Sequence, residues 1–232
     1  MLYNPTIEPL QVFSNSFLVP VAAFFVIALA LLVCLHLFLK KISESKIRPK
    51  SNKQKWRLKA ARKKHKGILK ASPSDRNNKL ENALNEMDGF EFELYAMELL
   101  RINLKPNYIS SPKLTADYGL DGVMVEGKHV LLLQSKHYMR SQLSAKAITD
   151  LADIRDRVIA RKRKNKFHKM IGIPRHLLAN AQHIVPVVIT TGAISSRVYD
   201  LAKSRDVIII SKKHLLTDLR RKFISELPSW QQ

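Results

Sequence analysis

The sequence has little cysteine and few acidic residues. Its 232 residues include one Cys and 19 Asp or Glu, against 40 Lys or Arg. Because Cys34 has no second cysteine to join, an intrachain disulfide and a cysteine-based metal cage are both excluded. The dispersed histidines show no spacing typical of a zinc site or a nucleophilic triad. The formal charge of +21 points to a polyanionic partner, either nucleic acid or an anionic membrane surface.

Charged residues are also absent from Pro9 to Leu39. Within this stretch, residues 18–39 form an apolar run of 22 residues. A helix of that length measures about 33 Å, which is enough to span a bilayer. A cleaved signal peptide is not favoured, because a basic start and a small-residue cleavage site are both missing. The sequence therefore predicts one uncleaved transmembrane helix.

A strongly basic stretch follows the apolar run. Between Lys40 and Lys70 there are fourteen Lys or Arg residues and a single acid, Glu44. By the positive-inside rule, residues 1–17 lie outside the cytoplasm and the rest of the chain lies inside it, as in a single-pass protein of the cell inner (plasma) membrane. We interpret residues 40–78 as a juxtamembrane linker that binds anionic membrane lipid, with DNA binding as the alternative.

A turn-rich break at Pro73 ends the basic stretch, and patterns typical of a folded domain begin near Lys79. The periodicity predicts a helix, three strands, a helix, a strand, a helix, a strand and a final helix. The predicted helices are 91–104, 143–160, 195–205 and 212–225, and the strands are 108–110, 120–125, 130–134, 184–191 and 207–210. This order predicts an α/β domain at residues 79–226, followed by a tail at 227–232.

Polar residues stand where two of the predicted strands begin or end. Asp121 opens the second strand, after Gly119 in the preceding turn. Gln134 and Lys136 close the third strand, and alternation along the strand places them on one face. A carboxylate, an amide oxygen and an ammonium group could thus converge to hold a divalent cation and position water. Short strands often end in polar residues, so a purely structural role remains the alternative.

Four motifs then occur in a characteristic order. They are Phe92-Glu93 with Leu99-Leu100 after it, Asp117-x-Gly119-x-Asp121, Gln134-x-Lys136, and the segment 187–219 with Thr190-Thr191-Gly192. In these motifs the chain resembles the Mrr-like branch of the PD-(D/E)xK nuclease superfamily, the catalytic module of some modification-dependent restriction enzymes. The resemblance covers about 87–219. It departs from the family at His137, where relatives commonly have Arg, and in the long connection 161–183.

The resemblance implies a restriction-endonuclease-like sandwich, with a central mixed sheet flanked by helices. It also implies that Asp121 ligates Mg²⁺ or Mn²⁺, that Gln134 is a second ligand where many relatives have Glu, and that Lys136 orients or activates water. Glu93 would join this site, while Asp117 would shape the approach loop. The implied activity is metal-dependent hydrolysis of DNA phosphodiester bonds by a membrane-anchored endonuclease of the restriction or DNA-defence type.

Cations in the long connection could follow a DNA phosphate backbone, although a basic surface that only aids solubility explains them equally well. These cations are Arg161, Lys162, Arg163, Lys164 and Lys166. A homodimer would supply two sites for cutting a duplex, but no residue pattern proves one. The alternative function is a catalytically inactive, membrane-tethered DNA-binding module with the same fold. RNA as the substrate has no sequence signature in its favour.

Overall fold

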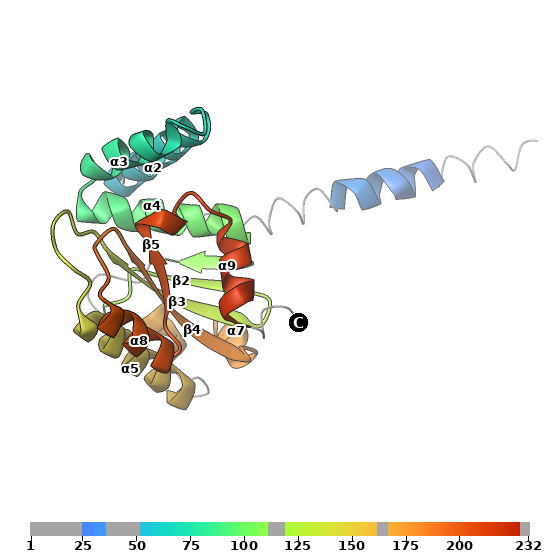
Figure 1. Cartoon of the computed structure of the whole chain (residues 1–232). Coiled ribbons are helices and arrows are strands. Elements are labelled where there is room, and N and C mark those ends of the chain that lie inside the picture. Colours follow the sequence, from blue (N-terminus) through green and yellow to red (C-terminus); the bar gives the residue numbers. More distant parts are fainter. Residues whose placement is uncertain (1–24, 36–51, 111–118, 162–166, 228–232) are drawn as a thin grey trace, which may run out of the picture. The chain divides into compact units, whose positions relative to one another are not determined.

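The computed structural model describes residues 25–35, 52–110, 119–161 and 167–227 (Figure 1). The chain divides into two compact units, Met1–Ser43 and Glu44–Gln232.

In the first unit the described residues form a helix at 25–35. Its apolar side chains are exposed, and those of Phe25, Leu29 and Leu32 are each more than 60% exposed. Among the residues that the structure describes, no helix is both long enough and apolar enough to cross a membrane. The ends of the predicted span at 18–39 lie outside the described residues, so the anchor stays a prediction.

The second unit is built on a five-stranded mixed sheet with the order β1-β2-β3-β4-β5. The strands are β1 (Tyr108–Ser110), β2 (Gly122–Glu126), β3 (His129–Lys136), β4 (His183–Thr190) and β5 (Ile208–Ser211). The first three strands pair antiparallel, whereas β3 with β4 and β4 with β5 are parallel, because helices connect them. The predicted α/β class, with a central mixed sheet, is confirmed.

Helices cover both faces of this sheet (Figure 1). On one face lie α4 (Gly89–Leu104) and α9 (Leu219–Glu226), and on the other lie α5 (Ala145–Arg161) and α8 (Ser196–Ser204). Alternate side chains of β3 serve the two cores: Leu131 belongs to the core under α4, and Leu132 to the core under α5. The two short helices α6 (Phe167–Ile171) and α7 (Arg175–Ala179) lie in the connection between α5 and β4.

The helix α4 illustrates how local sequence sets its bounds. At its start, the Asp88 carboxylate accepts a hydrogen bond from the backbone N–H of Glu91 at 2.7 Å. At its end, Lys105 adopts a left-handed conformation with φ of 51°, and Pro106 follows. Between them, buried Met97 packs against Gly122 of β2, while buried Tyr95 faces His65 of α2.

Among the described residues of the second unit, two helices precede α4: α2 (Asn52–Leu69) and α3 (Arg76–Asn85). Leu58, Ala61 and Ile68 of α2 lie in the same hydrophobic core as α4. The basic stretch therefore holds a packed helix from Asn52 onward, and the compact unit begins before Lys79, where the sequence placed the domain start. The apolar residues of α2 are few, but helical spacing puts them on one side.

The predicted single helix at 212–225 is wrong, because the structure divides it. A 3₁₀ turn at Lys212–His214 comes first, where His214 Nδ1 accepts a hydrogen bond from the backbone N–H of Ser211 at 3.2 Å. A new helix, α9, then begins after Asp218, whose carboxylate accepts from the N–H of Arg220 at 3.0 Å. The cap at Asp218 starts a second helix instead of continuing the first.

Candidate active site

Polar residues at the adjacent ends of β2 and β3 form the candidate site. The backbone N–H of Asp121 donates to the carbonyl of Leu133 at 2.9 Å, which extends the β2–β3 ladder and places Asp121 opposite Gln134. Directly opposed residues share a face of the sheet. Because side chains alternate along a strand, Gln134 and Lys136 of β3 lie on the same face as Leu132, which packs toward α5. The structure thus brings Asp121, Gln134 and Lys136 together on the face covered by α5.

Hydrogen bonds hold the two oxygen-bearing side chains in place. Oδ2 of Asp121 accepts the backbone N–H of Ser135 at 2.5 Å. Nε2 of Gln134 donates to the carbonyl of Gly119 at 3.0 Å, and Gly119 has φ of 80° in the turn before β2. Because a carbonyl only accepts, this bond identifies the nitrogen and turns the Gln134 oxygen the other way. That oxygen, Oε1, is buried and has no hydrogen-bond partner in the structure.

This arrangement fits a hard divalent cation. A buried amide oxygen without a partner is destabilising unless a ligand or water satisfies it. Carboxylate and amide oxygens are the donors that Mg²⁺ prefers, and Mg²⁺ usually keeps several waters with one or two protein carboxylates. In the described ranges, no group of three or more His, Cys, Asp or Glu gathers. The carboxylate of Asp121 and the amide oxygen of Gln134 are donors that fit an ion which keeps several of its waters.

The residue after Lys136 links the site to α4. His137 stacks on Phe92, with ring centroids 5.0 Å apart, and its Nε2 donates to the carbonyl of Met87, at 3.0 Å. Its Nδ1 lies 3.1 Å from Oγ1 of Thr191, the residue after β4. His137 thus has a structural role, because it joins the end of β3 to α4 and to Thr191. These contacts place the first turn of α4, with half-buried Glu93, near this end of the sheet, although α4 covers the opposite face.

The Thr-Thr-Gly motif holds the loop that leaves β3. Thr191 Oγ1 accepts the backbone N–H of Tyr138 at 2.9 Å. A Cβ added to Gly192 would lie 2.8 Å from both the carbonyl oxygen of Ser141 and Cδ2 of Tyr138. Glycine is therefore needed at position 192 because the backbone of another loop passes against it, at the exit from the strand that carries Lys136.

We expect Gly192→Ala to destabilise the protein by about 1–3 kcal/mol, because a backbone carbonyl cannot move aside as a flexible side chain can. The midpoint of urea unfolding measures this effect. Gly67→Ala in α2 is the matched control, since a Cβ there meets nothing within 4 Å. The control should gain about 0.5–1 kcal/mol from its higher helix propensity. A Gly192→Ala protein as stable as the original would contradict the close approach.

The structure does not bring the predicted DNA-contacting residue Arg161 to this end of the sheet. The helix α5 starts beside the end of β3 and runs back along the sheet for 17 residues, about 25 Å. Past the middle of this helix, Arg155 donates to the carbonyl of Arg205, just before β5 begins. Arg161 lies beyond that point and is exposed. Asp117, Lys162, Arg163, Lys164 and Lys166 lie outside the described residues.

Other cations, which belong to none of the sequence motifs, do lie at the site end. The loops after β3 and β4 meet there, since the N–H of Leu143 donates to the carbonyl of Ala193 at 2.9 Å. Exposed Arg140 and Lys146 flank this contact, and Arg197 stands in the first turn of α8. Their position directly after the carboxyl ends of parallel strands is the signal that could have identified them.

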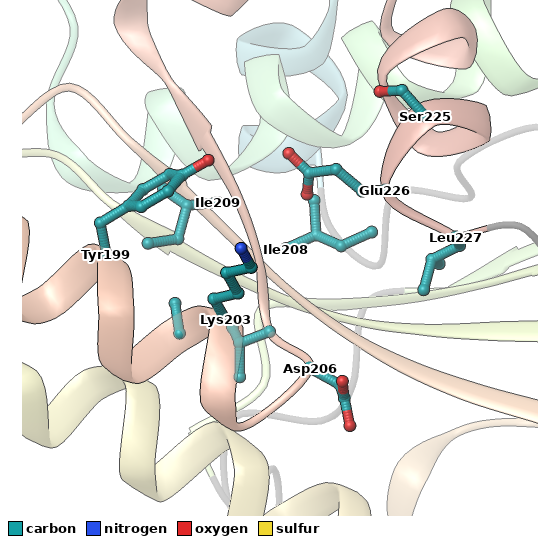
Figure 2. A pocket seen from close by; sticks show the side chains of 10 residues that line it. Tyr199, Lys203, Asp206, Ile208, Ile209, Ser225, Glu226 and Leu227 are labelled. Carbon is teal, nitrogen blue, oxygen red and sulfur yellow. The ribbon is translucent and has the colours of Figure 1, made fainter.

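A separate hollow of about 410 Å³ lies between α8, the edge strand β5 and α9 (Figure 2). The polar ends of Tyr199, Lys203 and Glu226 point into it, above the apolar floor of Ile208 and Ile209 (Figure 2). Asp121, Gln134 and Lys136 do not line this hollow, so it is distinct from the candidate site.

No family model and no curated protein matches the sequence. Among solved structures, the chain is similar to restriction endonuclease FokI bound to DNA, with 14% sequence identity and a TM-score of 0.44. The similarity covers 76% of this chain and 30% of that chain, so this protein spans less than a third of FokI's length. At this identity and TM-score, the similarity does not establish a function for this protein.

Proposed function

We propose that the protein is a metal-dependent endonuclease of the Mrr-like PD-(D/E)xK kind, which hydrolyses DNA phosphodiester bonds from a membrane anchor. The observation that carries the proposal is the buried, unpartnered Oε1 of Gln134, on the same face as the Asp121 carboxylate and the Lys136 ammonium group. Two oxygen donors can hold a metal ion that polarises a phosphoryl oxygen, and a neighbouring ammonium group can position water or offset charge.

Asp121 and Gln134 would hold Mg²⁺ or Mn²⁺, which when bound supplies polarisation of the phosphoryl oxygen and a lowered pKa for bound water. The Ser135 N–H keeps the Asp121 carboxylate oriented. Lys136, half-buried two residues beyond Gln134, would orient the attacking water and offset charge on the phosphate. Glu93 would assist from the start of α4. A restriction or DNA-defence role is the biological setting that we propose.

Two features support DNA and the membrane as the surroundings of this site. The net charge of +21, with exposed Arg140, Lys146 and Arg197 at the site end, favours a polyanionic substrate. The exposed apolar surface of the helix at 25–35 is unusual for a water-soluble unit and favours the proposed bilayer anchor. The strong positive-inside bias would then hold the nuclease unit in the cytoplasm.

The experiment that tests the proposed activity uses the full chain in detergent with supercoiled plasmid DNA, methylated or not. With Mg²⁺ or Mn²⁺ we expect nicking or cutting that EDTA abolishes. The N-terminal part is retained, because removing α2 would expose the core that Leu58, Ala61 and Ile68 help to form. Salt-dependent DNA binding without cleavage under either ion would instead favour the catalytically inactive binding module.

Gln134→Leu should weaken metal binding, because it removes the buried oxygen that we assign to the ion. We expect the Mg²⁺ concentration for half-maximal cleavage to rise about tenfold to a hundredfold. Gln134→Glu restores an oxygen donor and serves as the control, with metal dependence close to that of the original protein. Direct Mn²⁺ binding measured by electron paramagnetic resonance provides a readout besides activity. Unchanged Mn²⁺ affinity in Gln134→Leu would remove Gln134 from the metal site.

A further inference from the structure

The helix α2 has two flanks with different electrostatic surroundings. On one flank, its cations are neutralised within the protein. Arg57 pairs with Asp88 at 2.8 Å, and Lys64 pairs with Glu86 at 3.3 Å. Both acids come from the segment that connects α3 to α4. This flank has little excess charge to offer a partner.

On the other flank, the cations are not neutralised. Lys59, Lys63, Lys66 and Lys70 recur at intervals of three or four residues, so they form a stripe, and all four are exposed. In the part of the chain that the structure describes, none of them has a carboxylate within 4 Å. The stripe borders a groove of about 820 Å³ between α2 and α4, and we call it the α2–α4 groove.

A buried carboxylate and two arginines that bind it form the floor of the groove. Glu98 of α4 is only 2% exposed, and it binds two arginines through paired hydrogen bonds. Arg62 contacts its two oxygens at 2.9 and 3.3 Å, and Arg101 contacts them at 3.0 and 2.9 Å. The shared carboxylate thus holds both guanidinium groups beside the lysine stripe. Burial lowers the pKa of His65, although Glu98 opposes the shift, and this favours the neutral imidazole.

Apolar side chains stand exposed among these cations. Trp56 is 69% exposed, Leu69 is 48% exposed and Ile102, in the groove wall, is 38% exposed. Exposed tryptophan and aliphatic residues beside Lys and Arg are typical of a protein surface that enters the headgroup region of an anionic membrane. Nucleic acid alone would explain the cations but not the aliphatic side chains.

The position of the groove also favours lipid over DNA. The helix α2 packs on the side of α4 that faces away from the sheet (Figure 1). The candidate site lies on the opposite face, toward α5. In sequence, 12 residues separate the end of the apolar run at 18–39 from the start of α2. A groove that binds DNA for cleavage would instead be expected near Lys136.

We propose that the α2–α4 groove docks on the phosphate headgroups of anionic phospholipid. The four lysines and the two clamped arginines contact the phosphates, while Trp56 and Leu69 enter the headgroup layer. This docking turns the α5 side of the sheet away from the bilayer. The proposal rests on the proposed membrane location, whereas it does not require catalysis.

The test uses the full chain carrying Trp230→Phe, because Trp56 is then its single tryptophan. The chain is placed in lipid nanodiscs made of phosphatidylcholine, with or without phosphatidylglycerol, that contain a brominated lipid as quencher. We expect Trp56 fluorescence to be quenched several-fold more in discs with phosphatidylglycerol. The difference should vanish at about 1 M salt, where the Debye length is about 3 Å.

The charge requirement is tested by replacing the stripe, with Lys59→Gln, Lys63→Gln, Lys66→Gln and Lys70→Gln combined. We expect the half-maximal phosphatidylglycerol content for quenching to rise about tenfold or to become unmeasurable. The arginines are kept because they hold Glu98. A control with the same charge change at exposed positions elsewhere should quench like the original; it combines Lys128→Gln, Lys169→Gln, Lys203→Gln and Lys213→Gln.

Several outcomes would overturn the proposal. Equal quenching in neutral and anionic discs would show contact without headgroup recognition, and an equal loss in the control would show a general charge effect. If duplex DNA abolishes the quenching of Trp56 fluorescence, the groove is assigned to nucleic acid. If inorganic phosphate at the same phosphate concentration abolishes it, the groove is a site for free phosphate. Co-elution of the chain with neutral discs reports the anchor separately, so failure of the anchor is distinguished from failure of docking.

Discussion

Lys136→Met should lower the rate of DNA cleavage by about a thousandfold, while DNA binding changes little. Lys136 follows Gln134 on the same face of β3, where its ammonium group can reach water or phosphate beside the assigned metal ligands. Groups that position or transfer a proton in this way typically contribute about 10²–10⁴-fold. Methionine keeps most of the side-chain length, so the loss isolates the charge. Single-turnover cleavage of labelled duplex DNA with Mg²⁺ measures the effect.

The matched control is Lys203→Met on α8, whose side chain points into the hollow beside β5 rather than toward the site (Figure 2). It removes the same charge and should cleave at the original rate. DNA binding in Ca²⁺ and the melting temperature should be alike in all three proteins. If Lys136→Met cleaves as fast as the control, the assignment of Lys136 fails. If none of them cleaves but all bind DNA, the binding module is the better description.

The sheet and its helices could be predicted because their signals are local. The strand predicted at 108–110 is β1, and the polar turn before His129 produces the expected hairpin between β2 and β3. Prediction was poorer where contacts between distant parts of the sequence determine which segments are buried and where helices end. In α2 only a few apolar residues interrupt the cations, and their burial depends on α4 being present. The helix break before Asp218 depends on a side-chain cap.

The candidate site was predictable as a set of residues but not as a geometry. Alternation along β3 places Gln134 and Lys136 on one face, and motif order suggests Asp121 as their neighbour. Oε1 of Gln134 is left without a partner because Nε2 of the same amide donates to the carbonyl of Gly119. The sequence pattern does not reveal the direction in which this carbonyl points. Similarly, the basic run near Arg161 has a charge that suits DNA, yet its helix carries it toward the other end of the sheet.

Glu98→Gln should destabilise the protein by about 3 kcal/mol at pH 7, because removing one partner of a buried ion pair leaves the other charge uncompensated. Glu98 is almost wholly buried between Arg62 and Arg101, whose side chains are 41% and 25% exposed. Because the arginines can partly turn to water, we expect the lower end of the usual range for buried pairs. Urea unfolding of the full chain in one detergent measures the difference.

The exposed counterpart is Glu86→Gln, which removes the partner of Lys64. The side chain of Glu86 is 69% exposed, and exposed ion pairs contribute less than about 1 kcal/mol. A loss in Glu98→Gln no larger than in Glu86→Gln would show that the two arginines do not depend on the buried carboxylate. In that case Glu98 would not hold Arg62 and Arg101 in place beside the lysine stripe of the α2–α4 groove.

The pH dependence separates charge from packing at this position. Burial acts to raise the pKa of Glu98, but hydrogen bonds and charge from Arg101 and Arg62 outweigh it and lower the pKa below its ordinary 4.5. The unfolded chain therefore binds a proton at Glu98 more readily than the folded one does, and this carboxylate stabilises the fold fully above pH 4.5. The stabilisation is lost as the pH falls through the lower folded pKa. The difference in the free energy of unfolding between the original protein and Glu98→Gln should therefore stay constant from neutral pH down to about pH 4.5 and then become smaller. A difference that persists in acid would mean that the packing of the side chain, and not its charge, stabilises the fold at this position.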